Sequence, residues 1–303
     1  MAKVIIAIHG LRNKPPKSLL MEWGKMSIEE GFQNLALKAT LPTFEMVYWA
    51  DVLYEKPLSP EIKDPEDPYF LDEVYTPDPE KSFVESHTFQ RRFHYLLKKI
   101  IYKIFLKRNY KLRYSFLSKS FIHNNFRDLE IYFTENCENK HSKDCLSRKK
   151  INQRLIDVLE KHKNDEIFLI AHSMGSIIAF DVLSFILKDI KVHTFVTIGS
   201  PLGAPFVVSR IAKYSKQINQ SDIPLKTPET VYKNWFNFSD IRDSIAMDYN
   251  LADDFAPNSK GVKVIDQLVT NTYRMDKTIN PHKSFGYLRT PEFIKVLNDF
   301  IKE

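Results

Sequence analysis

The chain has 303 residues, of which 43% are hydrophobic and 13% aromatic, and its formal net charge is +6. This size suits one large domain with an insertion, or two small domains. No apolar stretch is long enough to span a bilayer, and two cysteines, Cys137 and Cys145, are too few for a disulfide framework. Because no segment has the pattern of an export signal, we expect a cytoplasmic protein whose two cysteines are free thiols, with pairing as the alternative.

Short apolar runs alternate with helical segments along most of the chain. The runs are rich in β-branched and aromatic residues, as in strands that are buried on both faces. In chain order we expect strands at Val4–Ile8, Phe44–Trp49, Ile167–Ala171, Thr194–Ile198, Tyr232–Phe238 and Val262–Leu268. Helices are expected at Leu19–Leu37, Arg148–Lys161, Met174–Leu187 and Ala204–Lys213, with a last helix that Thr290 caps and Pro291 begins. This alternation predicts a mostly parallel, doubly wound α/β sheet of about six to seven strands.

Residues 51–147 interrupt the alternation. Six prolines lie between Pro57 and Pro79, which favours an irregular segment, and Phe93 to Phe105 follow with apolar residues at helical spacing. We therefore expect a large helical cap or lid over 51–147, inserted into a core domain made of 1–50 and 148–303.

The charge of this insertion changes sign along its length. Asp51 to Glu85 hold eleven acidic and three basic residues, whereas Ser86 to Arg127 hold eleven basic residues and no acidic one. Either the two stretches neutralise each other, or 91–127 forms a basic amphipathic face that contacts an anionic membrane from one side, as a peripheral protein does. A nucleic-acid partner is disfavoured, because the helical apolar spacing suits packing better than base stacking.

The segment Ala171-His-Ser-Met-Gly-Ser176 stands between an expected strand and an expected helix. A serine on such a sharp turn, with Ala171 and Gly175 as small residues on either side, is typical of a nucleophile held out of a parallel sheet. Ser173 is therefore the candidate nucleophile.

A serine hydroxyl needs a base, and the base needs an acid that orients it. Only His193 and His282 follow Ser173, and His193 leads into a strand at the wrong end of the sheet, so His282 is the expected base. The acid should follow the strand Tyr232–Phe238. Asp243 is preferred to Asp240 because it lies further into the loop, with Asp248, Asp253 and Asp254 as the remaining candidates.

Acyl transfer also requires donors for a negatively charged oxygen. The backbone N–H of Met174, directly after the serine, is one expected donor. The second is the N–H of Leu11, which follows His9 and Gly10 at the end of the first strand. No phosphate loop, metal-binding His or Cys motif, or dinucleotide fingerprint occurs, so we expect neither a metal nor a cofactor.

Four patches resemble the α/β-hydrolase superfamily on its lipase and serine-esterase side. They are Ile8–Leu11, Ala171–Ser176, Thr197–Gly203, and Asn237–Ala246 taken with Asn280–His282. Ala171 departs from the glycine usual in that family, and 51–147 matches nothing in it. The resemblance implies an α/β-hydrolase fold, favours Asp243 as the acid, and implies hydrolysis of a carboxylic ester.

The leading hypothesis is thus an esterase or lipase that acts on a small-molecule or lipid ester. The alternatives are a membrane-surface phospholipase or lipid acyl hydrolase that uses the basic insertion, and a non-catalytic binding module on the same fold.

Overall fold

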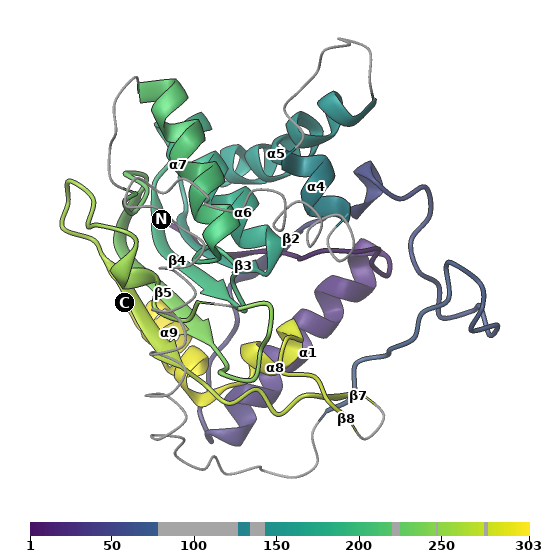
Figure 1. Ribbon diagram of the computed structural model, residues 1–303. Coiled ribbons are helices and arrows are strands. Elements are labelled where there is room, and N and C mark those ends of the chain that lie inside the picture. Colours follow the sequence, from purple (N-terminus) through teal and green to yellow (C-terminus); the bar gives the residue numbers. More distant parts are fainter. Residues whose placement is uncertain (78–126, 134–142, 220–224, 247, 276–277) are drawn as a thin grey trace.

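In the computed structural model, one parallel sheet of six strands lies between two layers of helices (Figure 1). The structure describes residues 1–77, 127–133, 143–219, 225–246, 248–275 and 278–303. The strand order is β2-β1-β3-β4-β5-β6. The strands are β1 (Lys3–Ile8), β2 (Thr43–Val47), β3 (Glu166–His172), β4 (Val192–Ile198), β5 (Val231–Ser239) and β6 (Val264–Leu268). All six expected strands are confirmed, with ends that differ by a few residues.

Helices cover both faces of this sheet (Figure 1). One layer contains α4 (Arg127–Phe133), α5 (Lys143–Lys161), α6 (Met174–Asp181) and α7 (Pro205–Asn219). The other contains α1 (Lys17–Asn34), α8 (Ser284–Leu288) and α9 (Pro291–Lys302). A short antiparallel pair, β7 (Arg274–Met275) and β8 (Thr278–Ile279), and two short 3-10 helices, Ala50–Val52 and Leu251–Asp253, lie in the connections.

The continuous apolar runs place hydrophobic side chains on both faces of the sheet. In β1, Ile6 and Ile8 belong to the hydrophobic core under α5, α6 and α7, whereas Ile5 and Ala7 belong to the core under α1 and α9. Successive side chains of a strand point to opposite faces, so a strand that separates two cores must be apolar at every position. This is why β1 shows no polar alternation.

Two helices differ from expectation in detail. The helix expected over Met174–Leu187 is α-helical only to Asp181 and continues as a π-helical segment, Val182–Ile186. Thr290 stands at the N-cap of α9, but its hydroxyl makes no bond to that helix and donates to the carbonyl of Tyr287 at 2.8 Å. Thr290 therefore connects α9 to α8 instead of capping α9.

Much of the expected cap or lid lies outside the described residues. This applies to 78–126, with the amphipathic stretch from Phe93 to Phe105, and to 134–142, with Cys137; of the Cys145 side chain nothing is described either. Within the described part, α4 buries Leu129, Tyr132 and Phe133 in the same core as α5 and α6. No helix in the described part of the chain combines the length and the apolar character that crossing a membrane requires.

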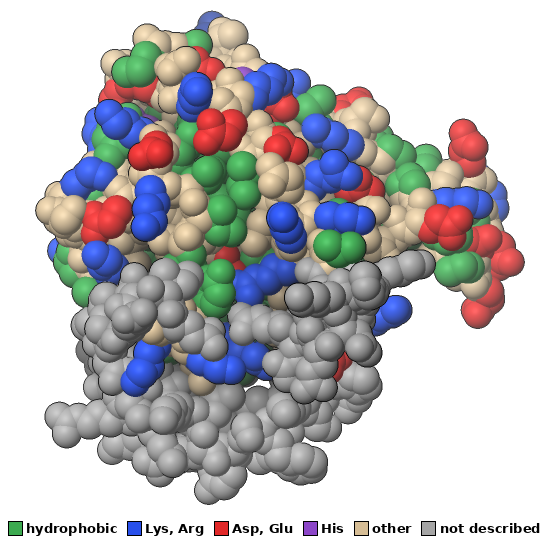
Figure 2. Space-filling model, turned by 90° about the horizontal axis from the view of Figure 1, so that it is seen from above, with side chains coloured by type: hydrophobic (Ala, Val, Ile, Leu, Met, Phe, Trp, Pro, Cys, Tyr) green, Lys and Arg blue, Asp and Glu red, His purple; other side chains and the backbone are tan. Residues whose placement is uncertain are grey.

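On the surface shown in Figure 2, Lys and Arg side chains are interspersed with Asp and Glu over the described residues. Ion pairs also join separate elements, such as Arg154 with Asp51 at 2.5 Å and Lys161 with Glu45. The contact of 91–127 with an anionic membrane stays a prediction, because all of that segment except Arg127 lies outside the described residues.

Candidate active site

The turn after β3 holds Ser173 in a strained backbone conformation. Its φ is 53° and its ψ is −127°, a region that residues with a side chain rarely adopt. A Cβ on Gly175 would lie 2.7 Å from the carbonyl oxygen of His9 and 2.8 Å from that of Ile8, so only glycine fits where α6 crosses β1. The expected need for a small residue at Gly175 is met, and the turn brings Ser173 to the carboxyl ends of β1, β3 and β4.

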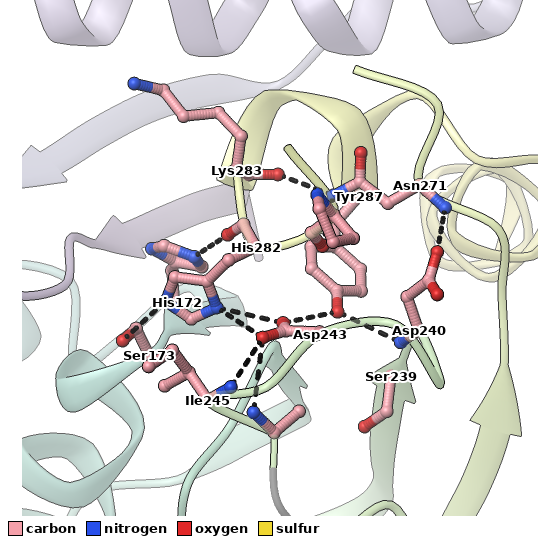
Figure 3. A network of polar contacts seen from close by, with 12 residues as sticks. His172, Ser173, Ser239, Asp240, Asp243, Ile245, Asn271, His282, Lys283 and Tyr287 are labelled. Carbon is pink, nitrogen blue, oxygen red and sulfur yellow. Dashed lines mark hydrogen bonds and ion pairs between the residues drawn. The ribbon is translucent and has the colours of Figure 1, made fainter. Parts of the chain in front are cut away.

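His282 lies beside Ser173, although 109 residues separate them in the chain (Figure 3). Its Nε2 is 3.0 Å from the Ser173 Oγ, and its Nδ1 is 2.9 Å from each carboxylate oxygen of Asp243. A carboxylate only accepts hydrogen bonds, so the Nδ1 holds the proton and the Nε2 is free to accept the serine proton. His193, the other candidate, lies in β4 and contacts Thr194 and Glu303.

Asp243 is buried and accepts hydrogen bonds from several donors. Besides His282, it accepts bonds from the backbone N–H of Ile245 at 2.9 Å and of Ala246 at 3.3 Å, and from the hydroxyl of Tyr287 at 2.8 Å. The Asp243 side chain is fully buried, whereas the His282 side chain is 28% exposed. The imidazole is therefore open to a substrate while its carboxylate partner is shielded from water.

Asp240, the second candidate acid, has a different set of partners. It pairs with the guanidinium of Arg242 at 2.6 Å and 3.0 Å and accepts the backbone N–H of Asn271 at 2.7 Å. Asp248 packs against Gly203 and accepts the backbone N–H of Asn250 at 2.8 Å. Of these candidates, Asp243 is the one that the structure brings to His282.

The loop after β1 lies directly against the serine. A Cβ on Gly10 would be 2.7 Å from the Ser173 Cβ and 3.2 Å from its Oγ. Leu11 follows in this loop, and Met174 is the first residue of α6, where the backbone N–H groups have no partner inside the helix. Both expected donors therefore come from segments that adjoin Ser173.

Buried polar groups hold the peptide between Gly10 and Leu11. The His9 Nε2 accepts the Trp49 N–H at 3.0 Å, so the His9 Nδ1 has the proton and donates to the Gly10 carbonyl at 2.8 Å. Burial, followed by the charge of Lys14, lowers the pKa of His9 to about 3, which keeps the ring neutral. The plane of the peptide that contains the Leu11 N–H is thus fixed.

The next residues of this loop contact α4. Arg12 has a left-handed φ of 70°, and its N–H donates at 2.7 Å to Asp128 of α4. The Lys14 ammonium donates to the Leu11 carbonyl and, at 3.2 Å, to the Arg12 carbonyl. Burial, with the nearby Lys283 charge second, lowers the pKa of Lys14 to about 7. Asp128 and Lys14 together hold a strained turn beside the serine.

Several residues around the serine have no role in the sequence analysis. Gly199 has φ 52°, and a Cβ there would lie 2.9 Å from the Asp243 Oδ2 and 3.2 Å from the His282 Nδ1. Tyr287 donates to Asp243 and His172 to the carbonyl of His282, while Asn271 donates to the carbonyls on either side of His282 (Figure 3). Gly199 and His172 lie in the patches that resemble lipases, so a signal existed for them. No local pattern marks Tyr287 or Asn271. Within the described ranges, His, Cys, Asp and Glu side chains form no group of three that could hold a metal ion.

Comparison with known protein families gives a match over part of the chain. The family described as Lecithin:cholesterol acyltransferase matches residues 148–244, which is less than half of the chain. The matched range includes Ser173 and Asp243, whereas His282 and the loop after β1 lie outside it. Comparisons with curated proteins and with solved structures found no match. The sheet and this family match together confirm the expected fold class.

Proposed function

We propose that this chain, which belongs to the α/β-hydrolase superfamily on its lipase and serine-esterase side, cleaves carboxylic esters through Ser173, His282 and Asp243. The observation that carries the proposal is the row of hydrogen bonds from the Ser173 hydroxyl to His282 at 3.0 Å and on to Asp243 at 2.9 Å. A nucleophile, a general base and an orienting acid stand in the order that acyl transfer requires.

In this mechanism the Ser173 Oγ attacks the ester carbonyl carbon, and its proton moves to the His282 Nε2. Asp243 stabilises the imidazolium that forms. The carbonyl oxygen becomes negatively charged and accepts bonds from the backbone N–H groups of Leu11 and Met174. When the tetrahedral intermediate collapses, the carbon–oxygen bond to the alcohol breaks and His282 returns the proton to the leaving alkoxide.

The acyl-enzyme is then released by the same groups acting in reverse order. His282 takes a proton from a water molecule, the hydroxide adds to the acyl carbon, and the serine oxygen leaves with the proton that His282 returns. The products are a carboxylic acid and the free enzyme. An alcohol in place of water would give a new ester, so the same residues serve an acyltransferase equally well.

For the substrate we propose a lipid ester, and this rests on the family match, whose description names lecithin and cholesterol. Turnover of p-nitrophenyl esters of increasing chain length, and of phosphatidylcholine vesicles, measures the preference. Activity that rises with chain length supports a lipid substrate, whereas activity confined to short chains contradicts it. The Ser173→Ala variant should lose turnover on every ester, and the His193→Gln variant, which removes a buried imidazole from β4, should keep it.

These assays distinguish the three functional hypotheses drawn from the sequence, because each predicts a different result. Turnover by wild type and none by Ser173→Ala supports an esterase or lipase. Activation by anionic vesicles over neutral ones supports the membrane-surface version. A folded protein without turnover on any ester supports the binding module. We favour catalysis, because a fully buried carboxylate aimed at an imidazole has no evident use in a binding module.

A further inference from the structure

In the loop that holds His282, three successive backbone carbonyls accept hydrogen bonds from side chains (Figure 3). The Asn271 Nδ2 donates to the Pro281 carbonyl at 2.9 Å and to the Lys283 carbonyl at 2.8 Å. Between these two, the His172 Nε2 donates to the carbonyl of His282 itself at 2.8 Å. Because each carbonyl only accepts, the two side chains must be the donors. The backbone on both sides of His282 is therefore fixed in position and in rotation.

Asn271 cannot turn its amide over. Its Oδ1 accepts the backbone N–H of Tyr273 at 3.1 Å, while its Nδ2 faces the two carbonyls, so a flipped amide would lose all three bonds. The residue is fully buried. A Cβ on Gly286, in α8, would lie 1.6 Å from the Asn271 Oδ1, so the helix that follows His282 packs tightly against this amide.

The backbone of Asn271 is held as firmly as its side chain. Its N–H donates to Asp240 at 2.7 Å, and its carbonyl accepts the Arg242 guanidinium at 3.0 Å. Arg242 and Asp240 also pair with each other at 2.6 Å. Asp240 follows β5 immediately, as part of the segment that leads to Asp243. The cluster thus joins the segment with the proposed acid to the loop with the proposed base.

We propose that Asn271 is a positioning residue for His282, an inference that rests on the proposed function. Asn271 touches no reacting atom. By holding the Pro281 and Lys283 carbonyls it keeps the imidazole between Ser173 and Asp243, at the 3.0 Å and 2.9 Å separations seen here. Asp240, the acid candidate that does not reach His282, acts through Asn271.

The test is the Asn271→Asp variant. It keeps the shape of the side chain and the bond from Tyr273, but it replaces the two N–H donors with a carboxylate oxygen that repels both carbonyls. A displacement of about 1 Å in a catalytic group lowers the rate about 100-fold, so we expect kcat to fall by roughly that factor while KM changes little. Because a protonated carboxyl group can donate to one carbonyl, the ratio of variant to wild-type kcat should rise as the pH falls from about 8 to about 5.5.

Asn258 offers a matched control. It is a buried asparagine whose Nδ2 also donates to two carbonyls, of Pro228 at 3.0 Å and of Val231 at 2.8 Å, and whose Oδ1 accepts the Val262 N–H at 3.0 Å. Val231 begins β5, so this clamp lies at the end of the sheet opposite Ser173. The Asn258→Asp variant should lose thermal stability as Asn271→Asp does, but keep wild-type kcat and a constant ratio to wild type across pH.

Should Asn271→Asp fail to fold, Asn271→Ser takes its place, because one hydroxyl reaches at most one of the two carbonyls; we expect kcat at least tenfold lower. Folded Asn271 variants with wild-type kcat, or an equal loss in Asn258→Asp, would overturn the positioning role while leaving the proposed function intact. A wild-type protein without turnover on any ester would instead overturn the proposed function, and the positioning role with it.

Discussion

The hydroxyl of Tyr287 connects both aspartates that follow β5, and its removal is a sharp test of how Asp243 is held. The hydroxyl donates to the Asp243 Oδ2 at 2.8 Å and accepts the Asp240 N–H at 3.0 Å. Burial, followed by the Asp243 charge, raises the pKa of Tyr287 well above its ordinary value, so the hydroxyl stays a donor across the working pH range. The Tyr287→Phe variant removes both bonds and leaves the ring in place.

The structure sets the expected size of the effect. A hydrogen bond to a charged group contributes about 1.5–3 kcal/mol, and a buried N–H left without a partner costs about 1–3 kcal/mol, so the free energy of unfolding should fall by roughly 2.5–6 kcal/mol. Asp243 keeps its bonds from Ile245, Ala246 and His282. We therefore expect kcat/KM to fall about tenfold, which corresponds to about 1.4 kcal/mol of lost transition-state stabilisation.

Ester hydrolysis across a range of pH is the assay. A carboxylate with one donor fewer attracts the imidazolium more strongly, so the acid limb of the kcat/KM profile should move to higher pH. Tyr132→Phe is the control, because the buried Tyr132 hydroxyl donates to Asp181 at 2.8 Å at the far end of α6. It should lose stability without moving the profile. Wild-type kcat/KM together with an unmoved acid limb in Tyr287→Phe would refute the reasoning.

Three further predictions concern the loop after β1 and its neighbours. In Gly175→Ala the new Cβ meets the carbonyl oxygens of His9 at 2.7 Å and of Ile8 at 2.8 Å, so we expect a loss of about 1–3 kcal/mol in unfolding free energy and at least tenfold in kcat. In Gly24→Ala the new Cβ meets only side chains, the Phe44 ring at 3.3 Å and the Met46 methyl group at 4.0 Å, and kcat should be kept. Because the pKa of His9 is about 3 in the folded chain and 6.5 is its ordinary value, the unfolded chain binds a proton that the folded chain refuses, and stability should fall as the pH drops from about 6.5 to about 3. The full pKa shift corresponds to roughly 5 kcal/mol of unfolding free energy. When the free energy of unfolding in urea is measured against pH, His9→Gln should flatten the curve over this range. A variant curve that matches wild type would contradict the assignment of this pH dependence to His9. Asp128→Ala removes the acceptor of the Arg12 N–H, so kcat for ester hydrolysis should fall about tenfold with KM little changed. An unchanged kcat would show that the bond from α4 to the loop after β1 does not affect catalysis.

The fold could be predicted because its signals are local. The central strands β1, β3 and β4 are buried on both faces, so their residues are mostly apolar whatever the neighbouring strand is. The serine turn is also local, since the crossing of α6 over β1 dictates Gly175 within a few residues of Ser173. Chain order then leaves His282 as the histidine that can reach the carboxyl ends of the strands.

Which of Asp243 and Asp240 faces His282 depends on a contact that could not be predicted from the sequence. Both follow β5 within three positions, and either could face His282. What separates them is Arg242, which pairs with Asp240 and, with Asn271, holds it away from the histidine. The preference for Asp243 came from its place in the loop and from the resemblance, and neither of these involves Arg242.

Tyr287 and Asn271 illustrate what the sequence does not reveal. Each acts through one polar group on a partner that lies in another segment, and a buried tyrosine or asparagine is otherwise an ordinary residue of a core or a turn. His172 is different, because it directly precedes Ser173 in a segment that resembles lipases, so the sequence places it near the active site. The direction of its N–H, towards the carbonyl of His282, emerges only when the two loops are brought together.

The central claim is that the hydroxyl of Ser173 is the attacking group, and a covalent fluorophosphonate probe tests it most directly. Intact-mass measurement followed by peptide mapping should find one adduct, on Ser173, and none in the Ser173→Ala variant, with loss of ester turnover in proportion to labelling. An adduct on another residue, or turnover that survives in the Ser173→Ala variant, would contradict the account.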